Sequence, residues 1–418
     1  MSGENWKRLD AVRRIKQAAL TVVEASKMLG VTERQVRRIV RAVVEEGARG
    51  VLHGNIGRSP PNRLRESVRK RIVKLMRGTY AGFNDQHFTE KLVEVEKIEV
   101  SRATVQRVLR GSGIGAARKR RPPKHRRRRD RKPQAGMMLL WDGSRHDWLE
   151  GRGPMLCLMG AIDDATSELL PGAHFVDQEC GEGYLRVLLA IAREKGLPWS
   201  AYMDRHGSLK RNDSFWTLEE ELRGKQDPTQ VLRAIELLGI EPIYALSPQA
   251  KGRVERLWGT AQDRLTSELR LAGARTAKEA NAVLCKYVPD HNRRFAVLPQ
   301  EAELAWRSIR KGLDLERICS FYYEATVSND NVVRLAGAPI IDIPPGPGGR
   351  SYAKARVEVR QYLDGSWRVF LRDALIATVT PATATAPGEL RALKDRKRSA
   401  SARAFRRGIQ RLTTVQRQ

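Results

Sequence analysis

The order of hydrophobic segments between residues 137 and 271 constrains the fold of this chain most strongly. Three short apolar runs are joined by polar connections short enough for antiparallel hairpins. Helical and strand-like patterns then alternate, and the last of them is a long helix with an apolar stripe from Val254 to Leu269. The predicted strands are 137–142, 155–163, 168–175, 199–203 and 241–246, and the predicted helices between them are 182–195 and 229–238. This order predicts a mixed α/β sheet.

Three acidic residues lie next to the predicted strands and at the start of the long helix. Asp142 and Asp204 each follow an apolar run, and Glu255 lies in the first turns of the long helix, beside its apolar stripe. We expect the two aspartates to emerge side by side and Glu255 to face the sheet edge. Carboxylates from two strand ends and one helix can hold a pair of Mg²⁺ ions, and two such ions can promote in-line displacement at a phosphodiester.

Each of these acids has a rival or a simpler explanation. Asp142 could be an ordinary turn residue at the end of a strand, and Glu255 could pair with Lys251 four residues earlier. The alternatives to the three acids, in chain order, are Asp147, Asp163, Asp164, Asp213 and Glu268.

Charge favours a nucleic-acid partner over a generally basic, soluble protein. The chain has 418 residues, a formal net charge of +29 and a pI near 10.5, and its Lys and Arg residues are clustered, which is the footprint of a phosphate-binding surface. The four cysteines are too far apart for a zinc or disulfide pattern. No apolar stretch approaches the roughly 20 residues of a membrane span.

Residues 1–53 predict a helix-turn-helix. Gly30 supplies a tight turn and Thr32 can cap a second helix. That helix would read DNA in the major groove, although a basic surface helix of an ordinary bundle is the alternative. Its candidate DNA-binding residues are Arg34, Gln35, Arg37, Arg38 and Arg41.

A second helix-turn-helix is predicted over residues 62–117, with helices at 65–76, 88–96 and 101–109. Ser101 is the expected cap of its last helix. The candidate DNA-binding residues there are Arg102, Gln106 and Arg107.

A basic linker follows at residues 118–134. It contains the run Arg126, Arg127, Arg128 and Arg129, and such a block repels itself and stays disordered without polyanions. We interpret it as an arm that follows DNA phosphates, the alternative being a solvated linker. After the core at 135–310, whose last part at 277–310 reads as helical, short strands at 320–380 predict a small β-barrel, and 381–418 is a basic tail.

In this order the segments resemble bacterial insertion-sequence transposases of the ISNCY type, within the DDE integrase/transposase superfamily. The matching motifs are residues 141–144, 161–166, 203–207 and 247–256, and the resemblance covers about residues 20–380. It implies a multidomain chain with an all-α tandem helix-turn-helix region, a ribonuclease H-like α/β core and a small β-barrel. Two departures are Arg205, inserted before His206, and a polar insertion at 208–228.

The resemblance implies that Asp142, Asp204 and Glu255 are the catalytic and metal-binding residues, holding two Mg²⁺ ions for which Mn²⁺ can substitute. It implies cleavage at the element's ends and joining of the 3′-ends to target DNA, by a homo-oligomer on paired ends in the bacterial cytoplasm, associated with the nucleoid. Lys251 and Arg256 would then contact DNA phosphates. His206 could orient a phosphate or attacking water, or be a surface turn residue.

Two other classes of protein are alternatives to a transposase. A non-catalytic DNA-binding regulator or domesticated transposase would have a broken triad, and this triad is intact. A nuclease that only hydrolyses would not need two DNA-reading regions.

Overall fold

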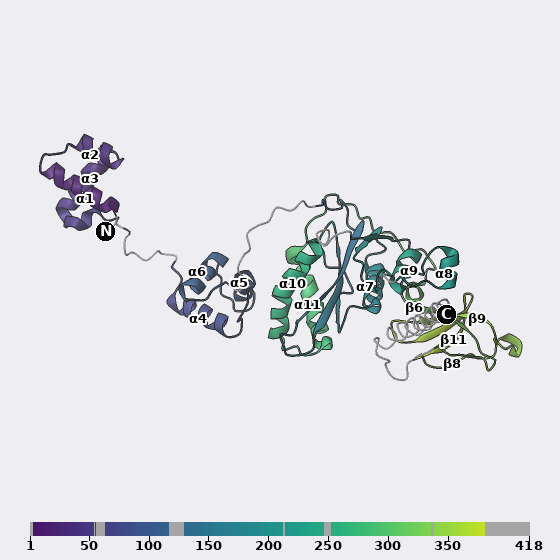
Figure 1. Cartoon of the computed structure of the whole chain (residues 1–418). Coiled ribbons are helices and arrows are strands. Elements are labelled where there is room, and N and C mark those ends of the chain that lie inside the picture. The colour runs from purple at the N-terminus through teal and green to yellow at the C-terminus, as the bar shows by residue number, and fades with distance from the viewer. Residues whose placement is uncertain are drawn as a thin grey trace, which may run out of the picture. The chain divides into compact units, whose positions relative to one another are not determined.

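The computed structural model describes residues 3–53, 55, 63–116, 129–211, 214–245, 252–335 and 338–380. The chain forms two compact units, Met1–Arg71 and Ile72–Gln418 (Figure 1).

Helices α1 (Gly3–Lys16), α2 (Val22–Leu29) and α3 (Glu33–Glu46), followed by a 3₁₀ turn (Gly47–Val51), make up most of the first unit. The predicted signals act as expected. Gly30 ends α2 at a φ of 64°, where a side chain would be strained, and the Thr32 hydroxyl caps α3 by accepting from the Gln35 N–H. Val12 of α1 and Ile39 and Val43 of α3 pack together between these helices.

A second group of three helices, at 66–111, follows the predicted pattern. They are α4 (Glu66–Arg77), α5 (Asp85–Glu94) and α6 (Arg102–Gly111). Ser101 caps α6 as expected. Helix α5 begins three residues before the predicted Phe88, because Asn84 accepts a hydrogen bond from the His87 N–H and so caps an earlier start.

The central sheet has five strands in the order β3-β2-β1-β4-β5. Strand β1 pairs antiparallel with β2, and β2 with β3, whereas β1–β4 and β4–β5 are parallel. The strands are β1 (Met138–His146), β2 (Leu156–Asp163), β3 (His174–Val176), β4 (Ser200–Met203) and β5 (Glu241–Tyr244). This mixed sheet, with an antiparallel first half and a parallel second half, confirms the predicted order of strands.

Two strands differ in length from the prediction. Strand β1 continues four residues beyond Asp142, because 143–146 pair with 156–159 of β2, so Asp142 lies inside the strand and not at its end. Strand β3 is reduced to three residues. The backbone turns at Pro171 and Gly172, whose φ of 84° lies outside the strand region.

Helices cover both faces of the sheet (Figure 1). Helices α7 (Gly181–Glu194) and α9 (Gln230–Leu237) pack on the face that carries Leu139 and Trp141. Helices α10 (Gly252–Leu271) and α11 (Ala277–Phe295) pack on the opposite face, and a short helix α8 (Leu218–Arg223) precedes α9. The layered arrangement explains why β2 is buried along its whole length.

The helical prediction for 277–310 is wrong in its second half. Helix α11 ends at Phe295, and the chain then continues along the core without forming a helix as far as residue 310. The N–H groups of Val297 and Ala305 donate to the carbonyls of Thr166 and Ala135, each at 2.8 Å. Pro299 also lacks the N–H that a continuing helix needs.

The C-terminal region is built of strands, as predicted, but the described residues do not confirm a closed barrel. One sheet has the order β11-β10-β9-β6, and β7 and β8 form a separate pair. The two share one core through Val333, Ile341 and Val359. The elements are α12 (Leu315–Ile318), β6 (Phe321–Thr326), β7 (Val332–Val333), β8 (Ile341–Asp342), a 3₁₀ turn (Pro347–Gly349), β9 (Arg356–Gln361), β10 (Trp367–Leu371) and β11 (Ala374–Val379).

Candidate active site

Asp142 on β1 and Asp204, directly after β4, occupy matching positions relative to two neighbouring parallel strands. The pairing of β1 with β4 runs as far as Leu140 opposite Tyr202, and each aspartate follows its residue of that pair by two positions. Side chains two residues apart in a strand share a face, and Leu140 and Tyr202 both pack towards α10 and α11. The register therefore places the two aspartates at neighbouring positions along the sheet.

Helix α10 reaches this pair through Trp258. The buried Trp258 indole Nε1–H donates to the Asp142 carboxylate at 3.2 Å. Glu255 lies three residues earlier on α10, so it is on the same side of the helix, one turn away. Its side chain is exposed to solvent, however, whereas we expected it to face the sheet edge.

A fourth carboxylate lies at this site, and the sequence reasoning missed it. Glu179, in the loop before α7, accepts a hydrogen bond from the Tyr184 hydroxyl at 2.6 Å and lies 3.2 Å from Nδ1 of His206. The His206 backbone N–H donates to Asp204 at 2.9 Å. In the sequence, the glycine next to Asp142 hints at a close neighbour on this side of the strand. A β-carbon at Gly143 would come 3.0 Å from the Glu179 carboxyl group.

The electrostatics of the site are dominated by negative charge. Burial raises the pKa of Glu179, and the nearby carboxylates of Asp204 and Asp142 raise it further, against the lowering effects of the Tyr184 hydrogen bond and His206. Burial likewise raises the pKa of Tyr184 well above its ordinary value, with Glu179 as the next cause. The Tyr184 hydroxyl therefore stays protonated and able to donate.

The donor set suits a hard divalent cation, because carboxylate oxygens are the ligands that Mg²⁺ prefers. Asp142 and Asp204 supply such oxygens, and both lie near enough to Glu179 to raise its pKa, although burial is the larger cause. Within the described residues no three His, Cys, Asp or Glu side chains are already arranged as a metal-binding group. Glu255 would have to turn towards the aspartates to complete one.

The rival aspartates have structural partners in the described chain. Asp163 is buried and accepts from three backbone N–H groups, of residues 136, 165 and 166. Asp164 is also buried, and it binds the guanidinium groups of Arg129 and Arg253. Asp147 accepts from the Gly151 N–H in the β1–β2 connection. Asp213 lies outside the described residues.

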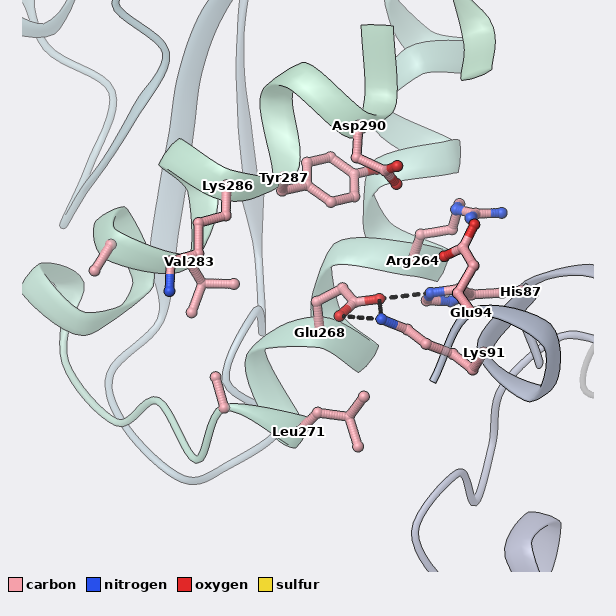
Figure 2. A pocket seen from close by; sticks show the side chains of 12 residues that line it. His87, Lys91, Glu94, Arg264, Glu268, Leu271, Val283, Lys286, Tyr287 and Asp290 are labelled. Carbon is pink, nitrogen blue, oxygen red and sulfur yellow. Dashed lines mark hydrogen bonds and ion pairs between the residues drawn. The ribbon is translucent and has the colours of Figure 1, made fainter. Parts of the chain in front are cut away.

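Glu268, the rival of Glu255, belongs to a different place in the molecule. It lies on α10 where that helix contacts α5 (Figure 2). His87 Nε2 lies 2.6 Å from one carboxylate oxygen of Glu268, and Lys91 Nζ lies 2.7 Å from the same oxygen and 2.9 Å from the other. These three residues line a cavity of about 470 Å³ together with Arg264, Tyr287 and neighbouring side chains of α10 and α11.

The predicted DNA-binding residues of the two helical regions are exposed. On α3 these are Arg34, Gln35, Arg37, Arg38 and Arg41, and on α6 they are Arg102, Gln106 and Arg107. The inward-facing residues of α3 are Val36, Ile39 and Val43. Each helix thus presents a polar, basic face to solvent.

The remaining predicted DNA-binding residues differ in their surroundings. Arg256 is exposed on the first turns of α10. Arg126, Arg127, Arg128 and Lys251 lie outside the described residues. Arg129 is bound to Asp164, and Arg131 donates to the carbonyls of Asp164 and Ala165. The last residues of the basic run are therefore bound to the core, whereas we expected the whole run to be disordered without a polyanion.

Hydropathy gives no sign of membrane insertion in the residues that the structure describes. No helix there combines the length and the apolar character needed to cross a bilayer.

Comparison with known proteins identifies relatives for most of the chain. A family model described as a winged helix-turn helix matches residues 8–70. The y4bF protein of Sinorhizobium fredii, which is named as a transposase, is 35% identical over 303 residues, covering 72% of this chain and 65% of its own length. The transposase for insertion sequence IS1202 of Streptococcus pneumoniae is 32% identical over 319 residues, covering 68% of this chain and 67% of its own. The chain thus spans about two thirds of the length of these relatives.

Solved structures give weaker likenesses. A chain of a simian T-cell lymphotropic virus intasome, in complex with the PP2A regulatory subunit B56 gamma, aligns with a TM-score of 0.31 and 12% identity, over 74% of this chain and 99% of that one. The catalytic core domain of BIV integrase aligns with a TM-score of 0.26 and 15% identity, over 39% and 88%.

Proposed function

Because this chain belongs to the family of insertion-sequence transposases, we propose that it binds the two ends of its DNA element, cleaves them and joins the 3′-ends to target DNA. The observation that carries the proposal is the matched placement of Asp142 on β1 and Asp204 directly after β4, with Glu255 one helical turn from the Trp258 that contacts Asp142. Acidic groups gathered at one sheet edge suit a reaction at a phosphodiester.

In this proposal Asp142, Asp204 and Glu255 hold the divalent cations, Mg²⁺ or in its place Mn²⁺. When bound, such ions lower the pKa of water or a 3′-hydroxyl and stabilise the departing oxygen. The chain's own residues align the site. Trp258 orients Asp142, and the His206 N–H orients Asp204. Arg256 and Lys251 contact phosphates beside the reacting bond.

DNA recognition is assigned to the helical regions. The exposed arginines of α3 and α6 would contact base edges in the major groove, and the basic run before β1 would follow phosphates in any sequence. Two ends must meet during transposition, so we assign catalysis to a homo-oligomer.

The direct test is end cleavage by the purified full-length protein. Inverted repeats bounding the gene supply the substrate duplex, and a scrambled duplex of equal length is the control. We expect Mg²⁺-dependent nicking at the repeat and joining of the new 3′-end to a plasmid, both stopped by EDTA. Selective binding without any cleavage would contradict the enzymatic assignment and favour a DNA-binding regulator.

End recognition has its own test. An Arg37→Ala, Arg38→Ala double variant should no longer give the footprint on the repeat, since a good side-chain pairing with a base edge supplies about 1–3 kcal/mol of discrimination. A variant with Arg13 and Arg14 of α1 changed to alanine is the control and should keep the footprint. If residues 129–380 alone bind the repeat as selectively as the whole chain, the helical regions are not the readers.

A further inference from the structure

Glu179 connects the elements that carry the two candidate catalytic aspartates. It lies between β3 and α7, and its side chain is about four-fifths buried. Its carboxylate accepts from Tyr184, a fully buried residue in the first turns of α7. Tyr184 in turn packs against Trp141, the neighbour of Asp142, with ring centroids 5.6 Å apart. One end of the Glu179 network is therefore anchored in the rigid core.

The other end reaches the loop after β4. Oε1 of Glu179 is 3.2 Å from His206 Nδ1, and the Ser208 N–H is 3.4 Å from the same nitrogen. Because the contact with the carboxylate is the shorter one, it favours the tautomer in which Nδ1 carries the proton and donates to Glu179. The backbone N–H of the same histidine donates to Asp204. Holding His206 thus holds the group that orients the Asp204 carboxylate.

The strand that carries Asp142 is shaped around the same side chain. At Gly143 an added β-carbon would lie 3.0 Å from both the carboxyl carbon and Cγ of Glu179. Glycine at this position lets the glutamate lie directly against β1. Three elements, β1, α7 and the loop after β4, therefore meet at Glu179.

We propose that Glu179 is a positioning residue of the active site, which fixes the Asp204 loop through His206 while Tyr184 fixes Glu179 itself. This inference rests on the proposed function. It differs from a fourth metal ligand in that Glu179 acts through the contacts of its Oε1 with Tyr184 and His206.

The distinction predicts an order among variants. Glu179→Ala removes both hydrogen bonds and should lower the single-turnover rate of end cleavage by roughly 10–100-fold, the usual effect of removing a group that orients a metal ligand. Glu179→Gln keeps an oxygen that accepts the same bonds and should recover most of the rate. Glu194→Ala, on the exposed last turn of α7, is the matched control and should cleave like the unchanged protein.

A double-variant cycle tests the route through His206. If Glu179 acts by holding this histidine, Glu179→Ala combined with His206→Ala should be no slower than the slower single variant. Multiplying effects would show that the two residues act separately and would overturn the proposal.

Two further measurements do not depend on catalysis. Mn²⁺ binding, followed by electron paramagnetic resonance on the full-length protein, should weaken about 10-fold in Glu179→Ala and little in Glu179→Gln. Circular dichroism checks that the variants fold. If Glu179→Ala does not fold, Tyr184→Phe, which removes one hydroxyl, should show a smaller loss of the same kind, and a full rate there would count against the network.

The outcomes separate the inference from its premise. If the unchanged protein does not cleave, the proposed function fails, and if Asp142→Asn still cleaves, Asp142 does not belong to the triad. If those two behave as expected but Glu179→Ala cleaves normally, or Glu179→Gln is as slow as Glu179→Ala, the positioning role fails alone.

Discussion

Two glutamate–histidine pairs in this molecule look alike locally and differ in everything around them. Glu179 lies 3.2 Å from His206 beside Asp142 and Asp204, whereas Glu268 lies 2.6 Å from His87 at the contact of α5 with α10. Both glutamates are largely buried, and burial favours the neutral acid in each.

Their neighbours then pull in opposite directions. At Glu268 the hydrogen bonds from His87 and Lys91 outweigh burial, and its pKa is lowered. At Glu179 burial prevails and two more carboxylates add to it, so its pKa is raised. The α5–α10 contact neutralises its own charge, as a structural contact should. At the candidate active site the neighbours of Glu179 include two further acids, and perturbed carboxyl groups of this kind are typical of functional sites.

The largest expected effect lies at the acidic site. Asp142→Asn, Asp204→Asn and Glu255→Gln should each reduce Mg²⁺-dependent cleavage by on the order of 10³-fold or more, because each removes a ligand charge with little change of shape. End binding, measured by gel shift, should be unchanged.

Asp147→Asn serves as the control for these variants, since Asp147 only supports a turn. Normal cleavage by any of the three variants would remove that residue from the triad. Normal cleavage by Glu268→Gln is also expected, and a catalytic loss there comparable to that of Glu255→Gln would break the contrast between the two pairs.

At the α5–α10 contact we expect a loss of local stability instead. Glu268→Gln should raise hydrogen exchange in α5 by an amount equal to about 1.5–3 kcal/mol, the usual contribution of hydrogen bonds to a charged group. The amide also turns a donor towards Lys91 or His87.

Glu94→Gln is the matched control at the same contact. Its partner is Arg294, but the Glu94 side chain is nearly half exposed, so we expect a loss of only about 0–1 kcal/mol. Equal exchange in the Glu268 variant and the unchanged protein would mean that this contact does not hold α5.

Acid should loosen the same contact. The pKa of His87 is lowered by burial and by Arg264 and Lys91, against the raising effect of Glu268, and the pKa of Glu268 is lowered as well. The folded state therefore binds fewer protons than the unfolded state, so the stability they contribute is present above the ordinary pKa values and lost as pH falls.

Between pH 7.5 and 5.5 only the His87 part should appear, starting below about 6.5 and falling by at most about 1.4 kcal/mol per pH unit. Hydrogen exchange in α5, corrected for intrinsic rates, measures it. His87→Gln should be insensitive to pH over this range, and an unchanged pH response in that variant would assign the effect elsewhere.

The smallest effect concerns the basic run at 118–132, of which Arg129 and Arg131 bind the core. Changing Arg126, Arg127 and Arg128 to glutamine should weaken binding to the repeat and to a scrambled duplex by a similar factor. It should also flatten the plot of log affinity against log salt by about 0.9 for each DNA phosphate that the variant no longer neutralises. A weakening confined to the repeat would give these arginines a part in sequence reading.

The sequence determined what depends on neighbours along the chain. Hydrophobic periodicity predicted the strands and helices of the core. The caps at Thr32 and Ser101 could be predicted because a capping side chain bonds to a backbone N–H only three residues away. The same periodicity placed Asp142 and Asp204 next to apolar runs, which made them candidates. The prediction extended the helix past Phe295, which is wrong. The hydrogen bonds that hold the following segment against the core come from residues more than 100 positions away in the chain.

Only the tertiary structure decided which acids share a site. Glu179 precedes α7 and Glu268 lies within α10, and the residues around each do not show which of the two reaches the aspartates. Packing of β1 against β4, and of the loop before α7 against both, brings Glu179 to the aspartates, while α5 supplies the cation and histidine that occupy Glu268. Charge interactions depend on distance in space and on burial, and the chain order contains neither until the sheet and its helices have assembled.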